Sequence, residues 1–376
     1  MASLDRESPH AAHLRAAVIG CGRMAYGHGE AYTRDPRVEL VACADIFPEA
    51  TERFAGQFAV PRQYVDFREM LREERPDIVS ICTHHHLHAP MTIETVEIAS
   101  PRAILCEKPI ALDLQSADAM LDACERAGTL LVVGHQRRFD RQTLAARRAL
   151  DEGRIGEILL VEAFGHPRSS LLVDSTHTVD LVRFLLDEPR ATWVLGQVDA
   201  REHREAWGQQ IEDCALAWIG FEDGSGAGVR LLLGAGSIMG ATPDERISTA
   251  TRPVEGPTYH RIVLHGTEGR LVLDGDRPID DRPLVYLQRG AECEVIYTAA
   301  EFHADPDFSA VAEEVRVLVD CLLTPGLTHP LEGRSARATL EILMGIYESS
   351  RRRQAVTLPL DVPDNALLTM LAEGVV

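Results

Sequence analysis

The sequence predicts an α/β protein in two parts: an N-terminal doubly wound parallel sheet and a C-terminal α+β part with a mostly antiparallel sheet. Residues 15–133 alternate between short apolar runs and amphipathic stretches, a pattern typical of parallel strands covered by helices. From residue 158 onward, strand-like runs follow one another and are separated by turn residues. A length of 376 residues fits two or three domains of about 150 residues each.

Five apolar runs are the expected strands of the parallel sheet. They are RAAVIG (15–20), VELVACAD (38–45), DIVSICT (77–83), AILCE (103–107) and TLLVVG (129–134). Between the last two runs, apolar residues recur at helical spacing, with Asp113 as the expected N-cap and Gly128 as the C-terminal stop. This alternation places the first domain at residues 14–136.

The second half, residues 137–376, carries the expected antiparallel sheet. Helical segments are expected near 141–153, 178–187, 308–323 and 333–350, and the last two are expected to close the second domain. The strand-like runs include EILLVEAFG, ATWVLGQVDA, CALAWIGFE, AGVRLLLG, RIVLHG, RLVLDG, LVYLQRG and CEVIYTA. Turn sequences such as EDGSG and GTEGR indicate antiparallel neighbours.

Composition argues against several classes of partner. The formal net charge is −20, which disfavours binding to nucleic acid or to an anionic membrane surface. No run approaches the roughly 18 apolar residues of a membrane span. The polar first 13 residues lack the apolar centre of a secretory signal, and the eight cysteines form no C-x-x-C pair. These features predict a cytoplasmic protein without disulfides.

A glycine-rich loop follows the first apolar run. Gly20-x-Gly22-x-x-Ala25 stands between a strand and a helix, the context in which backbone amides and a helix N-terminus hold a pyrophosphate. Asp45 ends the second run, where a carboxylate accepts ribose hydroxyls and repels a 2′-phosphate. The loop therefore predicts a Rossmann domain that binds NAD rather than NADP. The alternative is a tight turn in a sheet that binds no nucleotide.

Two further residues of this loop, Arg23 and Met24, are expected to contact the cofactor because they open the helix behind the glycines.

The segment CEKP contains Lys108, which is the only lysine among the 38 basic residues. It follows the fourth expected strand of the sheet, at the carboxyl end that faces the ligand crevice. Pro109 favours an extended Lys108 and permits a cis bond that aims the ammonium inward. Lysine shifts its pKa and exchanges protons, whereas arginine stays charged. Lys108 is therefore a catalytic candidate; the alternative is a chance lysine in an arginine-rich chain.

Six motifs in order, spanning residues 15 to about 355, give the chain a resemblance to the Gfo/Idh/MocA family of NAD(P)-dependent oxidoreductases. They are the glycine loop, Asp45, CTHHHLHAP, CEKPIAL, VVGHQRRF and STHTVDLVRFL. The resemblance implies a Rossmann domain followed by a domain with an open-faced sheet, with nicotinamide and substrate between them. It also implies homodimers or homotetramers, since family members often pair through the open sheets.

The resemblance implies catalytic roles for Lys108 and His177. In the family, the lysine of the E-K-P motif touches both the substrate hydroxyl and the cofactor, and the histidine donates or accepts the proton of that hydroxyl. Glu107, also in this motif, is expected to contact the cofactor. The family usually has an aspartate four residues before this histidine, whereas here Asp174 stands three before it. Asp174 is expected to orient His177 if the helical offset allows, and Asp180 to support the helix.

The histidine-rich run THHHLHAP suggests a metal, but no metal is expected. His84 and His88 are four apart, and ligands at that spacing meet only on a helix, whereas this loop leads from a strand into a helix near Pro90. The family resemblance instead places the loop along the cofactor, with Thr83, His84 and His88 as contacts. A purely structural His88 is the alternative.

The motif GHQRRF is expected at the mouth between the domains. Gln136 replaces the usual asparagine as a cofactor contact, and Arg138 binds substrate or pyrophosphate oxygen. An equally weighted alternative is that Arg138 forms a salt bridge at the domain interface.

These residues predict hydride transfer between a nicotinamide and a secondary hydroxyl of a sugar, cyclitol or related polyol. One alternative keeps the fold and cofactor but makes the net reaction a redox-neutral epimerisation or elimination through a transient ketone. Another is a non-catalytic regulator that binds nucleotide or sugar, which would need neither Lys108 nor His177.

Overall fold

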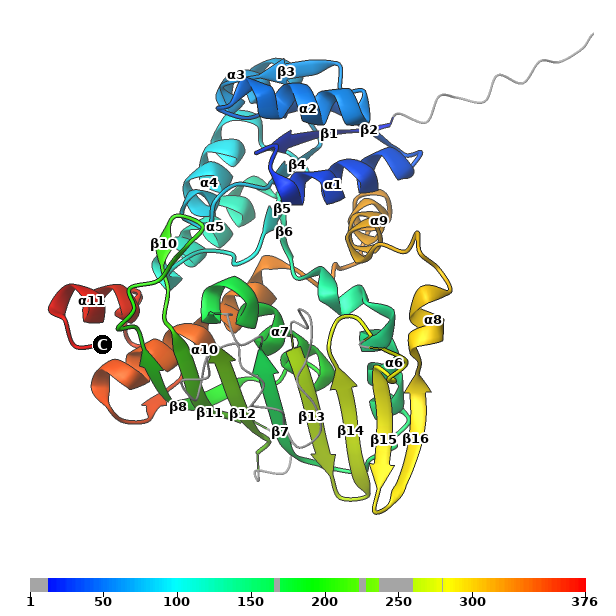
Figure 1. The fold of residues 1–376 in the computed structure, drawn as a ribbon. Coiled ribbons are helices and arrows are strands. Elements are labelled where there is room, and N and C mark those ends of the chain that lie inside the picture. The colour runs from blue at the N-terminus through cyan, green and yellow to red at the C-terminus, as the bar shows by residue number, and fades with distance from the viewer. Residues whose placement is uncertain (1–12, 166–169, 223–227, 237–259, 279) are drawn as a thin grey trace, which may run out of the picture.

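The structure is a computed structural model that describes residues 13–165, 170–222, 228–236, 260–278 and 280–376. Two large sheets organise it, one in each half of the chain (Figure 1). Within these residues, no helix combines the length and the apolar character needed to cross a membrane.

The first sheet has six parallel strands in the order β3-β2-β1-β4-β5-β6, which confirms the doubly wound prediction. The strands are β1 (Leu14–Ile19), β2 (Val38–Ala44), β3 (Arg62–Tyr64), β4 (Ile78–Ile81), β5 (Ala103–Glu107) and β6 (Leu130–Gly134). The strand order reverses between β1 and β4, and ligands of such sheets bind at this switch point, beyond the carboxyl ends of the strands. Strand β3 was not predicted, because it has three residues and only Tyr64 among them is buried.

Five helices connect these strands: α1 (Arg23–Arg34), α2 (Pro48–Phe58), α3 (Phe67–Glu74), α4 (His88–Ala99) and α5 (Leu114–Ala127). Helix α5 confirms the predicted caps. The Asp113 carboxylate accepts a hydrogen bond from the backbone N–H of Ser116, and Gly128 ends the helix in the left-handed conformation. Helix α4 begins at His88, two residues before the expected Pro90, after a short 3₁₀ turn His85–Leu87.

Helix α9 (Ala310–Leu323) does not pack where the sequence suggested. It was expected to close the second domain, but it lies against α1 on the first sheet (Figure 1). Its fully buried Val315, Leu318 and Val319 belong to the same apolar cluster as the strands of that sheet. The chain therefore returns to the first half after residue 309, and a single boundary at residue 136 does not describe this segment.

The second sheet has nine strands in the order β16-β15-β14-β13-β7-β12-β11-β8-β17. Only the pair β7 and β12 is parallel among its neighbours, so the prediction of a mostly antiparallel sheet is confirmed. The strands are β7 (Ile158–Gly165), β8 (Ala191–Asp199), β11 (Cys214–Phe221), β12 (Arg230–Gly236), β13 (His260–Gly266), β14 (Gly269–Asp274), β15 (Val285–Arg289), β16 (Glu292–Tyr297) and β17 (Val356–Thr357).

Three helices pack on the second sheet: α6 (Arg141–Asp151), α7 (Thr176–Leu185) and α10 (Gly333–Arg352) (Figure 1). Leu195 of β8 is paired with Trp218 of β11, Leu216 lies two residues before Trp218 on β11, and between 37% and 45% of each side chain is exposed. This exposed apolar surface agrees with the open-faced sheet that the resemblance implied.

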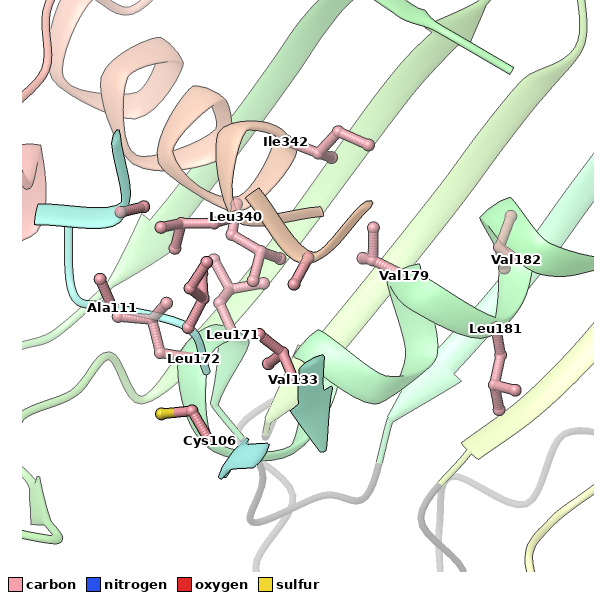
Figure 2. Packing of buried hydrophobic residues seen from close by; sticks show 14 of the residues in the cluster. Cys106, Ala111, Val133, Leu171, Leu172, Val179, Leu181, Val182, Leu340 and Ile342 are labelled. Carbon is pink, nitrogen blue, oxygen red and sulfur yellow. The ribbon is translucent and has the colours of Figure 1, made fainter. Parts of the chain in front are cut away.

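A continuous apolar core joins the two halves (Figure 2). Cys106 of β5 and Ala111 come from the first half, and Leu171, Leu172 and Leu340 from the second. Because these side chains are buried in one cluster, the carboxyl end of β5 is held against the segment that precedes α7.

Three smaller helices and a short hairpin complete the described chain. They are α8 (Ala299–His303), α11 (Ala366–Glu373), the π-helical turn Leu171–Ser175 and the hairpin of β9 (Glu205–Ala206) and β10 (Gln209–Gln210). All eight cysteines lie within the described residues, and each is a free thiol.

Candidate active site

The glycine loop presents a bare helix N-terminus. Gly20 has φ +86°, and a Cβ added there would come within 2.8 Å of the Cys82 carbonyl oxygen at the end of β4. Gly22 is the N-cap of α1, where no described side chain caps the helix, and a Cβ added there meets no described atom within 4 Å. Unpaired amides that face open space suit a pyrophosphate. The loop therefore fits the dinucleotide that the sequence predicted.

Gly20 and Gly22 give a matched pair of alanine variants. We expect Gly20→Ala to lower the melting temperature by several degrees, because its left-handed backbone costs an L-residue about 1–2 kcal/mol in addition to the clash. We expect Gly22→Ala to keep the wild-type melting temperature but to weaken NAD binding about 10-fold or more, because its methyl group would stand in front of the helix amides. Thermal unfolding and titration calorimetry test both; wild-type NAD affinity in Gly22→Ala would contradict the loop assignment.

Asp45 lies at the end of β2 beside this loop. Its two carboxylate oxygens accept hydrogen bonds from the backbone N–H groups of Cys21, at 2.8 Å, and Phe47, at 2.9 Å. These bonds fix the carboxylate, which is half-buried and retains lone pairs for a ribose hydroxyl. The geometry is therefore compatible with the predicted ribose contact.

The histidine-rich loop after β4 has two kinds of side chain. The Thr83 hydroxyl oxygen is buried with no hydrogen-bond partner among the described residues, which is compatible with a hydrogen bond to a ligand. His88 is fully buried, and its ring nitrogens face the carbonyl oxygens of Pro109, at 2.7 Å, and Thr83, at 3.2 Å. Burial lowers the pKa of His88. His88 thus connects this loop to the CEKP segment, which favours the alternative that His88 is structural. His84, in contrast, is exposed.

Lys108 lies where the two halves meet. The Lys108–Pro109 bond is cis, and Lys108 Nζ donates a hydrogen bond to the Val173 carbonyl oxygen of the second half at 2.5 Å. Burial lowers the pKa of Lys108, while the negative charges of Asp174 and Glu107 raise it. Arg23 of the glycine loop also lowers it, which places the nucleotide end of the site within electrostatic reach of this ammonium.

Glu107 holds the residue next to this lysine in place. Its carboxylate accepts a hydrogen bond from His28 Nε2 at 3.0 Å, and the other oxygen faces the Lys108 backbone N–H at 3.3 Å. Glu107 is buried, so the structure gives it a supporting contact with Lys108 rather than an open face.

Asp174 lies in a π-helical turn, Leu171–Ser175, that runs directly into α7. The backbone N–H of Ser175 donates to the Ser170 carbonyl oxygen at 3.0 Å, five residues back. The offset between Asp174 and His177 is therefore not that of a regular α-helix, because Asp174 lies in the wider turn and His177 in α7. The turn brings the Asp174 carboxylate close enough to Lys108 to raise its pKa.

His177 lies in the first turn of α7 and is 3% exposed. Its Nδ1 is buried with no hydrogen-bond partner among the described residues. Burial, assisted by the nearby charge of Lys108, holds the pKa of His177 well below its usual 6.5. A neutral imidazole at pH 7 can accept a proton, so His177 has the protonation state that a general base requires.

Two further histidines lie near His177, and neither was among the predicted site residues. The His135 ring lies edge-on to His177 at 5.5 Å, and its Nε2 is 2.9 Å from the Thr176 hydroxyl. His260, the first residue of β13, is buried close enough to affect the pKa of His177, and burial lowers its own pKa to about 3. His135 stands within the GHQRRF motif, but His260 carried no signal because only the fold brings β13 to this site.

Arg138 forms a buried ion pair. Its guanidinium donates to both carboxylate oxygens of Asp180, at 2.6 and 2.7 Å, and to the Pro330 carbonyl oxygen at 3.1 Å. Glu188 is a second acidic partner of the Arg138 guanidinium. These contacts favour the salt-bridge alternative for Arg138, with Asp180 of α7 as its partner. Gln136, in contrast, is partly exposed and has a buried Oε1 without a partner among the described residues.

No metal centre was expected from the histidine-rich run. Among the residues that the structure describes, no group of three or more His, Cys, Asp or Glu side chains is placed to hold a metal ion.

Comparison with known proteins decides the family. Residues 14–135 match the oxidoreductase family with an NAD-binding Rossmann fold. Over 279 residues the chain is 31% identical to inositol 2-dehydrogenase of Rhizobium meliloti (strain 1021), an alignment that covers 71% of this chain and 77% of the relative. The chain belongs to the Gfo/Idh/MocA family of oxidoreductases. This Gfo/Idh/MocA protein is an NAD-binding enzyme, as its sequence predicted.

Two further comparisons extend the match. The chain is 29% identical over 230 residues to scyllo-inositol 2-dehydrogenase (NAD(+)) of Bacillus subtilis (strain 168), covering 57% of this chain and 66% of that protein. The WlbA dehydrogenase of Bordetella pertussis, solved with NADH and UDP-GlcNAcA, superposes with a TM-score of 0.71 at 22% identity, covering 93% of this chain and all of that one. The second likeness shows that the Gfo/Idh/MocA fold extends over both halves.

Proposed function

We propose that this protein transfers a hydride between NAD and a secondary hydroxyl of a cyclitol, sugar or related polyol. The observation that carries the proposal is the meeting of Lys108 and His177, from different halves of the chain, at the carboxyl end of β5. The related proteins named as inositol dehydrogenases support this substrate class.

The roles follow from the protonation states. His177, neutral because it is buried, takes the proton of the substrate hydroxyl. Lys108, held by its hydrogen bond to the Val173 carbonyl, polarises the same substrate oxygen as its carbonyl character develops. The negative charge of Asp174 stabilises the protonated form of Lys108. NAD, when bound, would supply the acceptor for the hydride of the carbinol carbon.

The residues proposed to hold NAD lie along the crevice beyond β1, β2 and β4. The glycine loop with Arg23 and Met24 binds the pyrophosphate, Asp45 binds the ribose, and the Thr83 hydroxyl faces the nicotinamide end. His84 and Gln136 border this crevice as the remaining proposed contacts. Of these groups, the Thr83 hydroxyl and Gln136 Oε1 are buried without a hydrogen-bond partner among the described residues.

A turnover screen tests the proposed function. The pure protein is mixed with NAD or NADP and a panel of cyclitols, sugars and sugar acids, and absorbance at the nicotinamide band is followed. We expect net reduction with at least one cyclitol or sugar, and a preference for NAD. Conversion of substrate without net absorbance change would instead indicate a redox-neutral reaction, and NAD binding without conversion of any substrate a regulator.

We propose that the protein acts in the cytoplasm as a homodimer or homotetramer that pairs through the open sheet. The exposed Leu195, Leu216 and Trp218 support such pairing, because adjacent apolar side chains at a sheet surface are typical of an interface. The eight unpaired cysteines are consistent with a reducing compartment. Light scattering of the pure protein tests the oligomer, and a monomer at micromolar concentration would contradict it.

A further inference from the structure

Glu212 is a fully buried carboxylate that lies behind the proposed acid–base pair. One of its oxygens accepts the backbone N–H of Leu171, and the other accepts the Tyr347 hydroxyl at 2.7 Å. Burial raises the pKa of Glu212. A buried carboxyl group is costly unless it is hydrogen-bonded, so its position at this point of the fold requires a structural reason.

Leu171 is the first residue of the π-helical turn. The first N–H groups of a helical turn have no partner within the turn, and here two of them are bound from outside it. The Ser170 hydroxyl accepts the Val173 N–H at 3.2 Å, and Glu212 accepts the Leu171 N–H. Glu212 therefore anchors the start of the turn that carries Val173 and Asp174.

Val173 and Asp174 are two groups of the second half that act on Lys108. The Val173 carbonyl oxygen accepts a hydrogen bond from the Lys108 ammonium, and the negative charge of Asp174 raises the pKa of Lys108. A shift of the turn by about 1 Å would move both groups relative to Lys108, and displacements of this size can cost about 100-fold in rate.

The segment that carries Glu212 is also held at its other end. Gln209 donates a hydrogen bond from Nε2 to His85 Nδ1 at 3.0 Å, in the loop after β4. The Trp207 ring lies 6.4 Å from the His85 ring. Residues 205–212 thus contact the proposed cofactor loop at one end and the π-helical turn at the other.

We propose that Glu212 is a positioning residue that fixes the Leu171–Ser175 turn so that Val173 and Asp174 hold the Lys108 ammonium toward the reacting oxygen. This inference rests on the proposed function, because it deepens the role given there to Lys108. Glu212 itself touches neither substrate nor cofactor in the proposal.

Three glutamate variants test the inference. Glu212→Ala removes both hydrogen bonds, whereas Glu212→Gln preserves them, since an amide oxygen can accept the Leu171 N–H and an amide N–H can donate to the Tyr347 hydroxyl. Glu205→Ala, in the exposed hairpin of the same segment, is the matched control. We expect Glu212→Ala to lower kcat about 10-fold or more with NAD affinity within about twofold, and the other two variants to stay near wild type.

A second readout does not depend on turnover. Protein labelled with ¹³C at lysine Cε gives one signal, because Lys108 is the only lysine. We expect one narrow line in wild type and in Glu212→Gln, and a broadened or displaced line in Glu212→Ala, where the ammonium loses its fixed acceptor. A wild type without turnover on any polyol would refute the proposed function, while this signal would still decide the role of Glu212.

The outcomes are decisive. A folded Glu212→Ala with wild-type kcat or an unchanged Lys108 signal would overturn the inference, as would a Glu212→Gln variant as slow as Glu212→Ala. If circular dichroism shows Glu212→Ala to be unfolded, Tyr347→Phe replaces it, since this change removes one donor to Glu212. We then expect Tyr347→Phe to displace the Lys108 signal in the same direction by a smaller amount, and an unchanged signal would overturn the inference.

Discussion

Replacing Lys108 with arginine is expected to lower kcat about 1000-fold while leaving NAD affinity within about threefold. The single lysine meets the Val173 carbonyl oxygen through a compact ammonium, and burial lowers its pKa. A guanidinium is wider, planar and permanently charged, so it can neither fit the same acceptor geometry nor exchange a proton. Steady-state kinetics with the best substrate of the screen, together with calorimetric NAD binding, measure the two effects.

Arg334→Lys is the matched control for this variant. Arg334 is an exposed arginine that pairs with Glu125 on the surface, so the exchange should leave kcat unchanged. Wild-type turnover in Lys108→Arg would show that any cation suffices at position 108 and would refute the specific role of the lysine ammonium.

Replacing His177 with asparagine is expected to lower kcat by about 100- to 1000-fold. Asparagine keeps a polar side chain in the first turn of α7 but cannot take a proton, so the loss reports on proton transfer rather than on packing. The melting temperature should change little, because His177 Nδ1 has no hydrogen-bond partner among the described residues to lose. A variant that keeps wild-type kcat would assign the base to another group.

The pKa of His177 sets the expected pH dependence. A base is active when neutral, and the pKa of His177 lies well below 6.5, so its active form persists as the pH falls through 6.5. We therefore expect kcat for alcohol oxidation to show no loss near pH 6.5 that depends on His177. A loss with a midpoint near 6.5 in wild type that disappears in His177→Asn would contradict the buried, neutral state.

The sequence predicted the sheets better than the helix placement. Alternating apolar runs predicted β1, β2, β4, β5 and β6, because strands buried on both faces must be apolar throughout. The apolar stripe of α9 predicted a helix, but a stripe does not say which sheet it covers. That choice depends on contacts with α1, nearly 300 residues away in the chain.

Sequence alone indicates a candidate site residue where a motif carries its own geometry. Gly20, Gly22 and Lys108 were predicted because backbone conformation or residue chemistry restricts those positions. Glu212 and His260 gave no local signal, since they reach the site through long-range packing. Arg138 has partners in distant segments, so the sequence could not decide between its ion pair and a ligand contact.

The pKa of Lys108 in its two cofactor complexes tests the central claim most directly. With ¹³C at lysine Cε, one signal can be titrated in the presence of NAD⁺ and again with NADH. A positively charged nicotinamide beside the ammonium should give a lower pKa with NAD⁺ than with NADH, and both values should lie below the ordinary 10.5. Equal values near 10.5 in both complexes would place this amine away from the nicotinamide and contradict the account.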